Sequence, residues 1–428
     1  MPEPITAIRG MNDILPDETP LWLHAETIFR KVFQGYGYQE IRFPVLERTE
    51  LFKRSIGETT DIVTKEMYTF LDRNQESVTL RPEGTTPCVR ACLEHGLLYN
   101  QIQHLWYRGP CFRYERPQKG RLRQFHQASA EVFGLAGPDI DADLIMLSAT
   151  LLEKLGIKSH ATLQIHSMGN IASREVYRKK LTEYFLAHKN KLDADSLHRL
   201  HKNPLRILDS KDPTLKSLIE NAPKLLDHLD SDAIQHFEKL QEYLTHANIA
   251  FEINPHLVRG LDYYTKTVFE WVTDQLGAQG TVCGGGRYDH LVEQLGGKPT
   301  PAIGFSFGME RTILLMQQAT QKNKITNELH AYVITDNEEA FIHGLKLTHY
   351  LRSKVSGLHI MLHSGGGTLK NQFKKADKSG AQYAVIIGEH ELKTNSISLK
   401  SLREDIQQQT LYQDELAEYL KLKIQKKQ

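Results

Sequence analysis

The stretch GPCFRYERPQKGRLRQFHQASAEVFG, residues 109–134, decides the fold of this chain. It alternates strand-forming residues with charged ones, contains the turn sequence Pro-Gln-Lys-Gly, and then alternates again, which predicts a β-hairpin with its turn over Pro117–Gly120. Side chains two residues apart in a strand share a face, so we expect Arg113 and Glu115 on the same face as Cys111.

The second strand of this hairpin is expected to place Phe125, Gln127, Ser129 and Glu131 on one face. A cation, an aromatic ring, an amide and a carboxylate would then meet on one concave surface, as in a binding site. The alternative is a solvated face with surface ion pairs, which is common in antiparallel sheets. The residues alone leave both interpretations open.

The segment LRPEGTTPCVR, residues 80–90, places Glu83 in a turn before a helix predicted over Thr85–His95. We expect Thr85 or Thr86 to be the N-cap. Glu83 has a structural interpretation, because a carboxylate is favourable near a helix N-terminus. It also has a functional one, because a carboxylate in a rigid turn suits an ammonium group.

The segment VRGLDYYTKTVFEW, residues 258–271, reads as a strand introduced by Arg259, with Gly260 permitting close approach of the backbone. In a strand, Tyr263 and Tyr264 would point to opposite faces, so we expect one of them in a pocket and the other in the core.

The segment AIGFSFGMERTILL, residues 302–315, predicts a strand, a break at Gly308, and a helix that begins near Glu310 and Arg311. A cation in the first turn of a helix opposes the helix dipole, and such a violation often marks a functional site.

Composition narrows the class of protein. The formal net charge of +1 over 428 residues argues against bulk adhesion to nucleic acid or membranes, although it allows a local basic patch. We find no signal peptide and no apolar run long enough for a bilayer, and therefore expect a soluble, cytosolic protein. Cys88 and Cys92 have helical spacing, but with only four cysteines in the chain we expect buried thiols rather than half of a zinc site.

The pattern along the chain predicts an α+β core with antiparallel hairpins, interrupted by a helical insertion over residues 171–244. After about residue 327, apolar runs alternate with lysine-rich helical stretches, which predicts a separate α/β domain with a parallel sheet. The glycine runs at residues 284–286 and 365–367 do not fit a Walker A loop. If the protein binds ATP, it does so with arginines on an antiparallel sheet.

These segments resemble a known family. FRYERPQKGRLRQFHQ with AEVFG, and GFSFGMER, are similar to motifs 2 and 3 of class II aminoacyl-tRNA synthetases. LVRGLDYYTKTVFEW and TVCGGGRYDHLVEQLGG resemble two motifs specific to histidyl-tRNA synthetases, and RGMNDILP, LRPEGTTPCVRA and NPLRILDSKDP resemble the bacterial type. The resemblance implies a class II catalytic domain over residues 1–325, with the insertion at 171–244, and an anticodon-binding domain over residues 326–428.

The resemblance also implies an activity: a histidine–tRNA ligase that forms histidyl-adenylate from L-histidine and ATP, releases pyrophosphate, and transfers histidine to the 3′ end of tRNA(His). ATP would be a substrate and Mg²⁺ would assist, although no residue is assigned as a metal ligand. The motif 1 segment IRFPVLE, which contains Pro44, implies a homodimer interface. The location implied is the cytoplasm, with no membrane partner.

Residue roles follow from the same resemblance. Arg113 and Arg259 would contact the α-phosphate and Arg311 the γ-phosphate, so these three residues are the catalytic candidates. Glu115 and Phe125 would contact adenine, so that the ATP-binding residues are Arg113, Glu115, Phe125 and Arg311. The implied histidine-binding residues are Glu83, Gly84, Thr85, Arg113, Gln127, Glu131, Arg259, Tyr263 and Tyr264.

Contacts to tRNA are implied at two places. Arg116 and Gln118 would lie near the extra 5′ guanosine of the acceptor end. Lys370, Lys374, Lys375 and Lys378 would lie on a basic helix near anticodon phosphates, although a lysine-rich helix can also be an ordinary solvated face.

Several positions depart from the common family pattern. Cys111 and Tyr114 replace frequent Met and His, His290 replaces a glycine, and His166 replaces an asparagine. Phe307 and Met309 are apolar substitutions in motif 3. None of these changes removes a charge with an assigned role, but the loss of glycine at His290 puts the local backbone in question.

Two other functions are compatible with such a sequence. One is an inactive paralogue that regulates an ATP phosphoribosyltransferase, and the other is a binding module that senses uncharged tRNA. The retained Arg113, Arg259 and Arg311, together with the last domain, favour the active enzyme.

Overall fold

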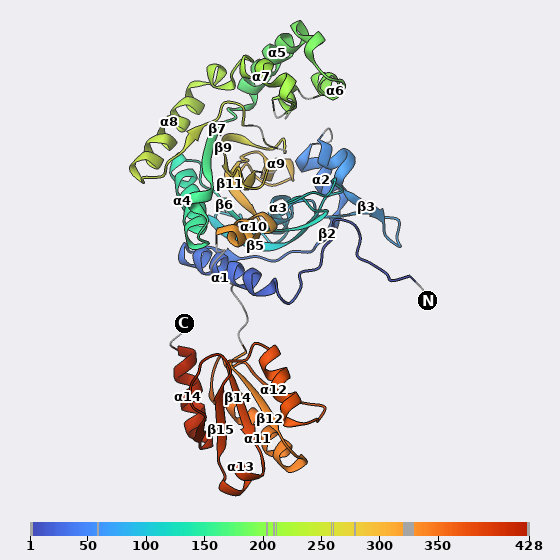
Figure 1. Cartoon of the computed structure of the whole chain (residues 1–428). Coiled ribbons are helices and arrows are strands. Elements are labelled where there is room, and N and C mark those ends of the chain that lie inside the picture. Colours follow the sequence, from blue (N-terminus) through green and yellow to red (C-terminus); the bar gives the residue numbers. More distant parts are fainter. Residues whose placement is uncertain are drawn as a thin grey trace. The chain divides into compact units, whose positions relative to one another are not determined.

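The computed structural model in Figure 1 describes residues 3–57, 60–202, 204–208, 210, 212–257, 259, 261–277, 280–319 and 329–425. The chain forms two compact units, Met1–Lys324 and Ile325–Gln428, which are called the larger and the smaller unit below. The domain boundary predicted between residues 325 and 326 lies outside the described residues. None of the helices in the described part of the chain is long and apolar enough to cross a bilayer.

The larger unit is built on an eight-stranded sheet in the order β1-β5-β6-β11-β10-β9-β7-β8. Only the two outer pairs, β1 with β5 and β7 with β8, are parallel. The strands are β1 (Gln39–Glu40), β5 (Gln103–Phe112), β6 (Gln124–Phe133), β7 (Thr162–Ser167), β8 (Glu252–Ile253), β9 (Thr265–Val272), β10 (Thr281–Arg287) and β11 (Ala302–Gly308). The order brings the quoted segments together, because β6, β11, β10 and β9 are neighbours.

Helices cover one face of this sheet. They are α1 (Thr19–Gly35), α4 (Pro138–Lys154) and α10 (Met309–Ala319). Phe29 of α1 packs edge-on against Phe307 of β11 at 5.2 Å, and Phe33 stacks on Trp106 of β5 at 5.2 Å. Ala128, Ala130 and Val132 of β6 join this core, so the alternating residues from Phe125 to Glu131 point to the opposite face.

Smaller elements surround the second face. A three-stranded sheet consists of β2 (Leu46–Arg48), β4 (Ser77–Leu80) and β3 (Tyr68–Leu71). The nearby helices are α2 (Thr49–Ile56), a π-helical turn (Ile62–Glu66), α3 (Thr85–Glu94) and α9 (Leu291–Gln294).

The segment predicted as a helical insertion contains α5 (Ile171–Ala187), α6 (Ala194–Lys202), α7 (Lys216–Glu220) and α8 (Ser231–His246). Short 3₁₀ turns occur within it at Lys189–Lys191, Pro204–Ile207, Pro213–Leu215 and Leu225–His228, and another precedes β7 at Lys158–His160. Figure 1 shows α5, α6 and α7 grouped apart from the sheet and α8 beside α4. Within NPLRILDSKDP, residues 203, 209 and 211 lie outside the described part.

The smaller unit has a sheet in the order β13-β12-β14-β15-β16. Its strands are β12 (Ala331–Thr335), β13 (Ile360–Leu362), β14 (Tyr383–Ile387), β15 (Ile397–Ser401) and β16 (Gln409–Leu411), and its helices are α11 (Glu338–Lys354), α12 (Leu369–Lys378), α13 (Glu389–Thr394) and α14 (Gln413–Gln425). The expected parallel pairing holds for β13, β12 and β14. β15 and β16, for which no pairing was predicted, are antiparallel to their neighbours. The connection between β14 and β15 is too short for a parallel crossover, which needs about a dozen residues.

Two local expectations are wrong. β5 ends at Phe112, so Arg113 and Glu115 lie in the connection beyond the strand rather than in it. Tyr263 and Tyr264 precede β9, which begins at Thr265, so strand alternation does not apply to them. Pro44 lies between β1 and β2, outside both strands, which fits its inability to donate to a ladder.

Candidate active site

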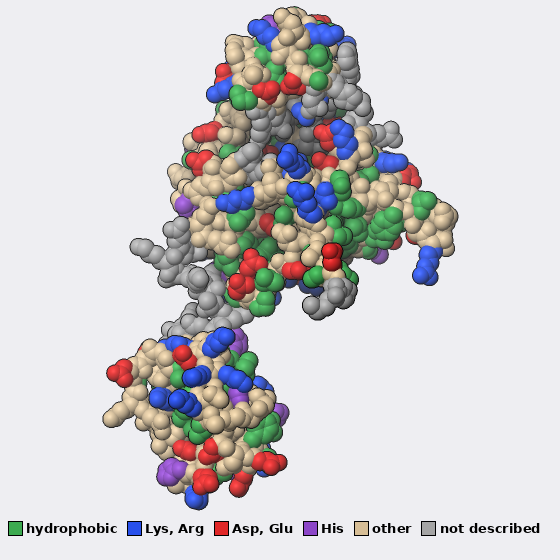
Figure 2. Space-filling view, turned by 45° about the vertical axis from the view of Figure 1, so that its right-hand side comes forward, with side chains coloured by type: hydrophobic (Ala, Val, Ile, Leu, Met, Phe, Trp, Pro, Cys, Tyr) green, Lys and Arg blue, Asp and Glu red, His purple; other side chains and the backbone are tan. Residues whose placement is uncertain are grey.

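A cavity of about 270 Å³ lies on the sheet face opposite α1 and α4, and three arginines from distant parts of the sequence line it. Arg113 follows β5, Arg259 precedes β9, and Arg311 is in the first turn of α10. Figure 2 shows Lys and Arg side chains clustered on one face of the larger unit. Other predicted residues that line the cavity are Glu83, Thr85, Glu115, Phe125, Gln127, Tyr263 and Tyr264.

Arg113 is positioned by the turn before α3 and by the hairpin. Its Nε–H donates to the carbonyl oxygen of Pro82 at 2.9 Å, and its guanidinium carbon lies 5.3 Å from the centre of the Phe125 ring. This geometry combines a cation–π contact with an anchored guanidinium. The cavity therefore presents an anchored guanidinium and an aromatic ring side by side.

Arg259 forms an ion pair with Glu270 of β9, and its guanidinium carbon lies 5.4 Å from the centre of the Tyr264 ring. Burial lowers the pKa of Arg259, but Tyr264 and Glu270 outweigh it and the pKa is raised. A Cβ on Gly284 would lie 2.4 Å from a terminal nitrogen of Arg259. The glycine run of β10 thus leaves room for this side chain.

Arg311 links two elements at the edge of the cavity. Its Nε–H donates to the carbonyl oxygen of Gly120 at 2.8 Å, and one terminal NH group donates to that of Thr281 at 2.6 Å. Burial, with Arg121 and Arg113 nearby, lowers the pKa of Arg311 to about 10, so the side chain remains a cation at neutral pH. The neighbouring Glu310 accepts the backbone N–H of His126 at 2.9 Å, which ties the first turn of α10 to β6.

The position of Glu83 agrees with both the structural and the functional interpretation of this residue. Its carboxylate accepts the backbone N–H groups of Thr85 at 2.6 Å and Thr86 at 3.0 Å, and the side chain lines the cavity. Burial raises the pKa of Glu83, while these hydrogen bonds and Arg113 act in the opposite direction. The predicted N-cap at Thr85 or Thr86 is wrong, because α3 begins at Thr85 and Gly84 is the N-cap. A threonine N-cap was unnecessary, because Glu83 already accepts the free N–H groups.

Glu131 lies beneath the cavity and is only 1% exposed. Its Oε1 accepts hydrogen bonds from the hydroxyls of Thr85 and Tyr107, both at 2.8 Å, and its Oε2 accepts one from the hydroxyl of Tyr288. Burial raises the pKa of Glu131 to about 8, against the effect of these three donors. Glu131 does not line the cavity surface, although Thr85 and Tyr288 do.

The sequence interpretation missed Tyr107 and Tyr288. Tyr107, Gly109 and Cys111 are alternate residues of β5 and therefore share a face. The alternation that placed Cys111 on the site face would have placed Tyr107 there as well. Tyr288 follows the glycine run. Only its hydrogen bond to Glu131, which comes from another strand of the sheet, shows that it belongs to the site. Gly84 does not line the cavity; a Cβ there would lie 2.2 Å from the Tyr107 ring, so its glycine lets that ring approach.

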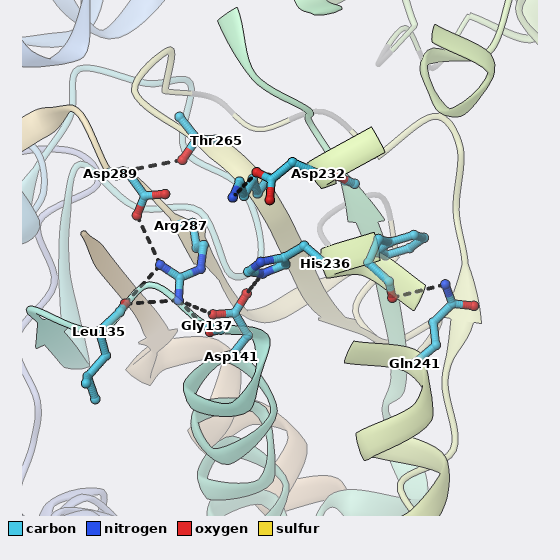
Figure 3. A network of polar contacts seen from close by, with 12 residues as sticks. Leu135, Gly137, Asp141, Asp232, His236, Gln241, Thr265, Arg287 and Asp289 are labelled. Atoms are coloured by element: carbon cyan, nitrogen blue, oxygen red, sulfur yellow. Dashed lines mark hydrogen bonds and ion pairs between the residues drawn. The ribbon is translucent and has the colours of Figure 1, made fainter. Parts of the chain in front are cut away.

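A buried ionic network fixes the chain on both sides of Tyr288 (Figure 3). Arg287, which is fully buried, donates to the carbonyl oxygens of Leu135 and Gly137 and pairs with Asp141 at 2.7 Å and Asp289 at 3.0 Å. Asp141 also contacts His236 of α8 at 2.7 Å. These interactions link β10, α4 and α8 beside Tyr288, which lines the cavity.

Both tyrosines before β9 line the cavity, with ring centroids 4.8 Å apart. The prediction that only one of them can line the pocket is therefore wrong, because a turn can present adjacent side chains to the same side. Both rings are also buried in the hydrophobic core. Gly260, which was expected to allow close backbone approach, lies outside the described residues.

The residues predicted to contact tRNA do not line this cavity. Gln118 forms an isolated bridge with Arg121 at the tip of the hairpin and borders a separate cavity of about 650 Å³. Arg121 forms an ion pair with Glu115. Arg116 lies on the same connection, two residues before Gln118, and lines neither of these cavities.

The departures from the family pattern are accommodated. His290 has φ −98°, an ordinary right-handed conformation that needs no glycine. The Cys111 thiol donates to Oε1 of Gln127 at 3.3 Å. His166 is buried, and burial lowers its pKa to about 3. Cys88, Cys92, Cys111 and Cys283 are buried free thiols, and the described residues contain no group of three or more potential metal ligands among His, Cys, Asp and Glu.

Comparison with known proteins identifies the family. Residues 10–312 match the family model described as histidyl-tRNA synthetase, which is well over half of the chain. The chain belongs to the histidyl-tRNA synthetase family. Residues 330–423 match a second family model, described as an anticodon binding domain.

Solved structures of histidyl-tRNA synthetases agree with this assignment. The apo enzyme of S. aureus is 34% identical, with a TM-score of 0.80 over 97% of this chain and 100% of that one. The enzyme from Nostoc sp. PCC 7120 is 22% identical, with a TM-score of 0.71 over 98% of this chain and 100% of that one. An ATP phosphoribosyltransferase regulatory subunit/histidyl-tRNA synthetase from Bacillus halodurans C is 20% identical, with a TM-score of 0.64 over 91% of this chain and 100% of that one. The last two show the fold alone, and the predicted fold class and bacterial-type family are confirmed.

Proposed function

We propose that this chain, an ATP-dependent histidine–tRNA ligase, carries out its chemistry in the three-arginine cavity. The observation that carries the proposal is the convergence of Arg113, Arg259 and Arg311 on one cavity directly above the buried Glu131. Three cations suit a polyphosphate and a carboxylate, and a buried carboxylate suits an imidazole N–H.

The first step joins two anions. A carboxylate oxygen of histidine forms a bond to the α-phosphorus of ATP, while the bond from that phosphorus to the bridging oxygen of pyrophosphate breaks. No covalent enzyme intermediate is needed, so the protein must orient the reactants and stabilise the charge on phosphorus and on the leaving group. Arg113 and Arg259 would bind the α-phosphate and Arg311 the γ-phosphate, each with the fixed donor fork of a guanidinium.

Adenine would bind against Phe125, whose ring already carries the Arg113 guanidinium at 5.3 Å. Glu115 also lines the cavity and can accept a hydrogen bond from an exocyclic amino group. Its ion pair with Arg121 would hold that carboxylate in place.

Histidine would be recognised at both ends. Glu83, Thr85 and Gln127 would bind the α-ammonium group, and Glu131 and Tyr264 the two ring nitrogens, with Tyr263 beside them. A carboxylate has about four acceptor positions, and three hydroxyls already occupy three of those on Glu131, which leaves one for a ring N–H. An analogue without ring nitrogens would leave buried polar groups unpaired, and sites of this kind discriminate by about 10⁴ to 10⁵.

The residues present fit an assisting Mg²⁺ that enters with ATP. Magnesium is commonly bound through one or two carboxylates together with substrate phosphates, and Glu115 and Glu270 are carboxylates that line the cavity. When bound, the ion would neutralise phosphate charge beside the arginines.

The second step needs tRNA(His) as a partner. Arg116 and Gln118 on the hairpin connection would contact the acceptor end. In the smaller unit, Gln372 and Ala376 form the buried side of α12, while Lys370, Lys374, Lys375 and Lys378 are exposed. Figure 2 shows Lys and Arg grouped on one face of this unit, as an interface with anticodon phosphates requires.

We also propose a homodimer through the segment that contains Pro44, and a cytoplasmic location, which suits four free thiols.

Histidine-dependent exchange of pyrophosphate into ATP tests the proposal. The purified chain should catalyse it, whereas an inactive regulatory paralogue or a tRNA sensor should not. Arg259→His should leave histidine binding measurable and reduce exchange by at least about 10²-fold. Arg403→His, in the smaller unit, is the control and should exchange normally. Unimpaired exchange by Arg259→His would remove Arg259 from the mechanism.

A further inference from the structure

Helix α5 carries an arginine, Arg174, in its first turn. The N-cap Asn170 accepts the backbone N–H of Ser173 at 2.8 Å, and Arg174 follows in the first turn of the helix. A cation there opposes the helix dipole, as Arg311 does in α10. Such a position is better explained by a contact outside the helix than by helix stability.

That contact is with the turn that carries the pocket tyrosines. A terminal NH group of Arg174 donates to the carbonyl oxygen of Tyr264 at 2.8 Å and approaches that of Asp262 at 3.5 Å. The Arg174 side chain is only partly exposed. A charged donor therefore holds the backbone of Tyr264, whose ring lines the cavity on its other side.

Neighbouring contacts join the same two segments. The backbone N–H of Met168 donates to the carbonyl oxygen of Lys266 at 2.6 Å, and that of Lys266 donates to Gly169 at 3.0 Å. Lys266 has φ +41°, a left-handed conformation that a lysine adopts only when its surroundings impose it. Its Nζ also pairs with Asp232 of α8 at 2.7 Å. The start of α5 and the start of β9 are thus held side by side.

We propose that Arg174 is a positioning residue for histidine recognition: from the helical insertion it fixes the backbone of Tyr264 so that the tyrosine hydroxyl reaches the imidazole. This inference rests on the proposed function and deepens it, because it connects the insertion to amino-acid selectivity. Arg174 does not line the cavity in which ATP and histidine are proposed to bind. Its loss should therefore weaken histidine binding more than it slows the chemical step.

The primary test is steady-state pyrophosphate exchange by Arg174→Ala and Arg174→Lys. We expect the KM for histidine to rise about 10- to 100-fold in Arg174→Ala, with less than about threefold change in the KM for ATP and in kcat. Arg174→Lys retains one charged donor and should recover part of the affinity. Lys179→Ala removes an exposed cation from the same helix and should behave as wild type.

A double-mutant cycle with Tyr264→Phe separates positioning from a general structural effect. If Arg174 acts through Tyr264, Arg174→Ala should raise the KM for histidine much less in the Tyr264→Phe background than in wild type. Additive effects, or equal changes in the KM values for histidine and ATP, would overturn the proposal. Should Arg174→Ala fail to fold, Arg174→Met, which keeps the aliphatic stem, takes its place in the cycle. An inactive wild type would refute the proposed function instead.

Discussion

Glu131 lies directly against Gly304, and a Cβ built on this glycine would fall 1.6 Å from Oε2 of the carboxylate. The two residues come from adjacent strands, where Gly304 of β11 pairs with Glu131 of β6. The absence of a side chain at residue 304 therefore creates the space in which the buried carboxylate is held.

Gly304→Ala should abolish histidine-dependent exchange or raise the KM for histidine at least about 100-fold, because overpacking a buried site displaces its side chains. Exchange kinetics and histidine calorimetry measure this effect. Gly35→Ala is the control: a Cβ at Gly35 of α1 would meet nothing within 4 Å, and the change should be neutral or stabilise by up to about 1 kcal/mol. Normal histidine affinity in Gly304→Ala would contradict the placement of Glu131.

Stability and histidine binding should depend on pH through Glu131. Its pKa of about 8 lies above the ordinary value of 4.5, so between these values the folded chain holds a proton that the unfolded chain has lost. The free energy of unfolding contributed by this group is therefore present below about pH 4.5 and is lost as the pH rises through 8. Urea titrations from pH 5 to pH 9 should show this decline in wild type and a smaller one in Glu131→Gln. Parallel curves for the two proteins would rule out the raised pKa.

Histidine affinity should follow the opposite trend. The carboxylate accepts a ring N–H best when it is ionised, so the Kd for histidine should fall as the pH rises toward 8, once the titration of the ligand itself is subtracted. Calorimetry at several pH values measures it. Glu131→Gln should bind histidine at least about 100-fold more weakly and lose this pH dependence.

The buried pair of Arg287 and Asp141 should contribute strongly to the stability of the larger unit. Asp141→Ala leaves a fully buried guanidinium without its main counter-charge, and the free energy of unfolding should fall by about 3–5 kcal/mol. The double variant Asp141→Leu with Arg287→Met removes both charges and should recover much of this loss. Asp232→Ala removes an exposed carboxylate from the same region and should cost less than about 1 kcal/mol. Similar losses in Asp141→Ala and Asp232→Ala would contradict the assignment.

The exposed lysines of α12 should affect tRNA binding and leave adenylate formation unchanged. Lys374→Ala with Lys378→Ala should weaken tRNA(His) binding and reduce the slope of log Kd against log salt concentration by about one for each phosphate that is no longer neutralised. Filter binding at several salt concentrations measures the slope, and pyrophosphate exchange provides the internal control. Lys346→Ala on α11 is a matched surface change. An unchanged slope would identify the lysine face of α12 as an ordinary solvated surface.

Much of this architecture was predictable because its signals are local. Period-two alternation in residues 124–133 selected the face of β6 that carries Phe125, Gln127 and Glu131. The break at Gly308 and the helix that opens with Glu310 and Arg311 were also predicted correctly. These features depend on neighbours along the chain, which a sequence displays directly.

The errors arose where the chain leaves regular structure. Tyr263 and Tyr264 were assigned to opposite faces, but they lie in a turn and both line the cavity. Arg113 was placed in a strand that ends one residue earlier. Periodicity predicts side-chain direction only while a strand continues, and its end depends on pairing with a distant partner.

The sequence by itself indicated the class of chemistry, because its motifs of arginines, carboxylates and an aromatic ring resemble those of a known family. Only the tertiary structure decided which hydroxyls surround Glu131, which glycine makes room for it, and which arginine of the insertion holds the turn beside it. Those partners are far from the residues they position along the chain. Tyr107 is 24 residues from Glu131, and Gly304 is 173 residues from it. Their contacts exist only after the strands have paired and the helices have packed, so no local pattern records them.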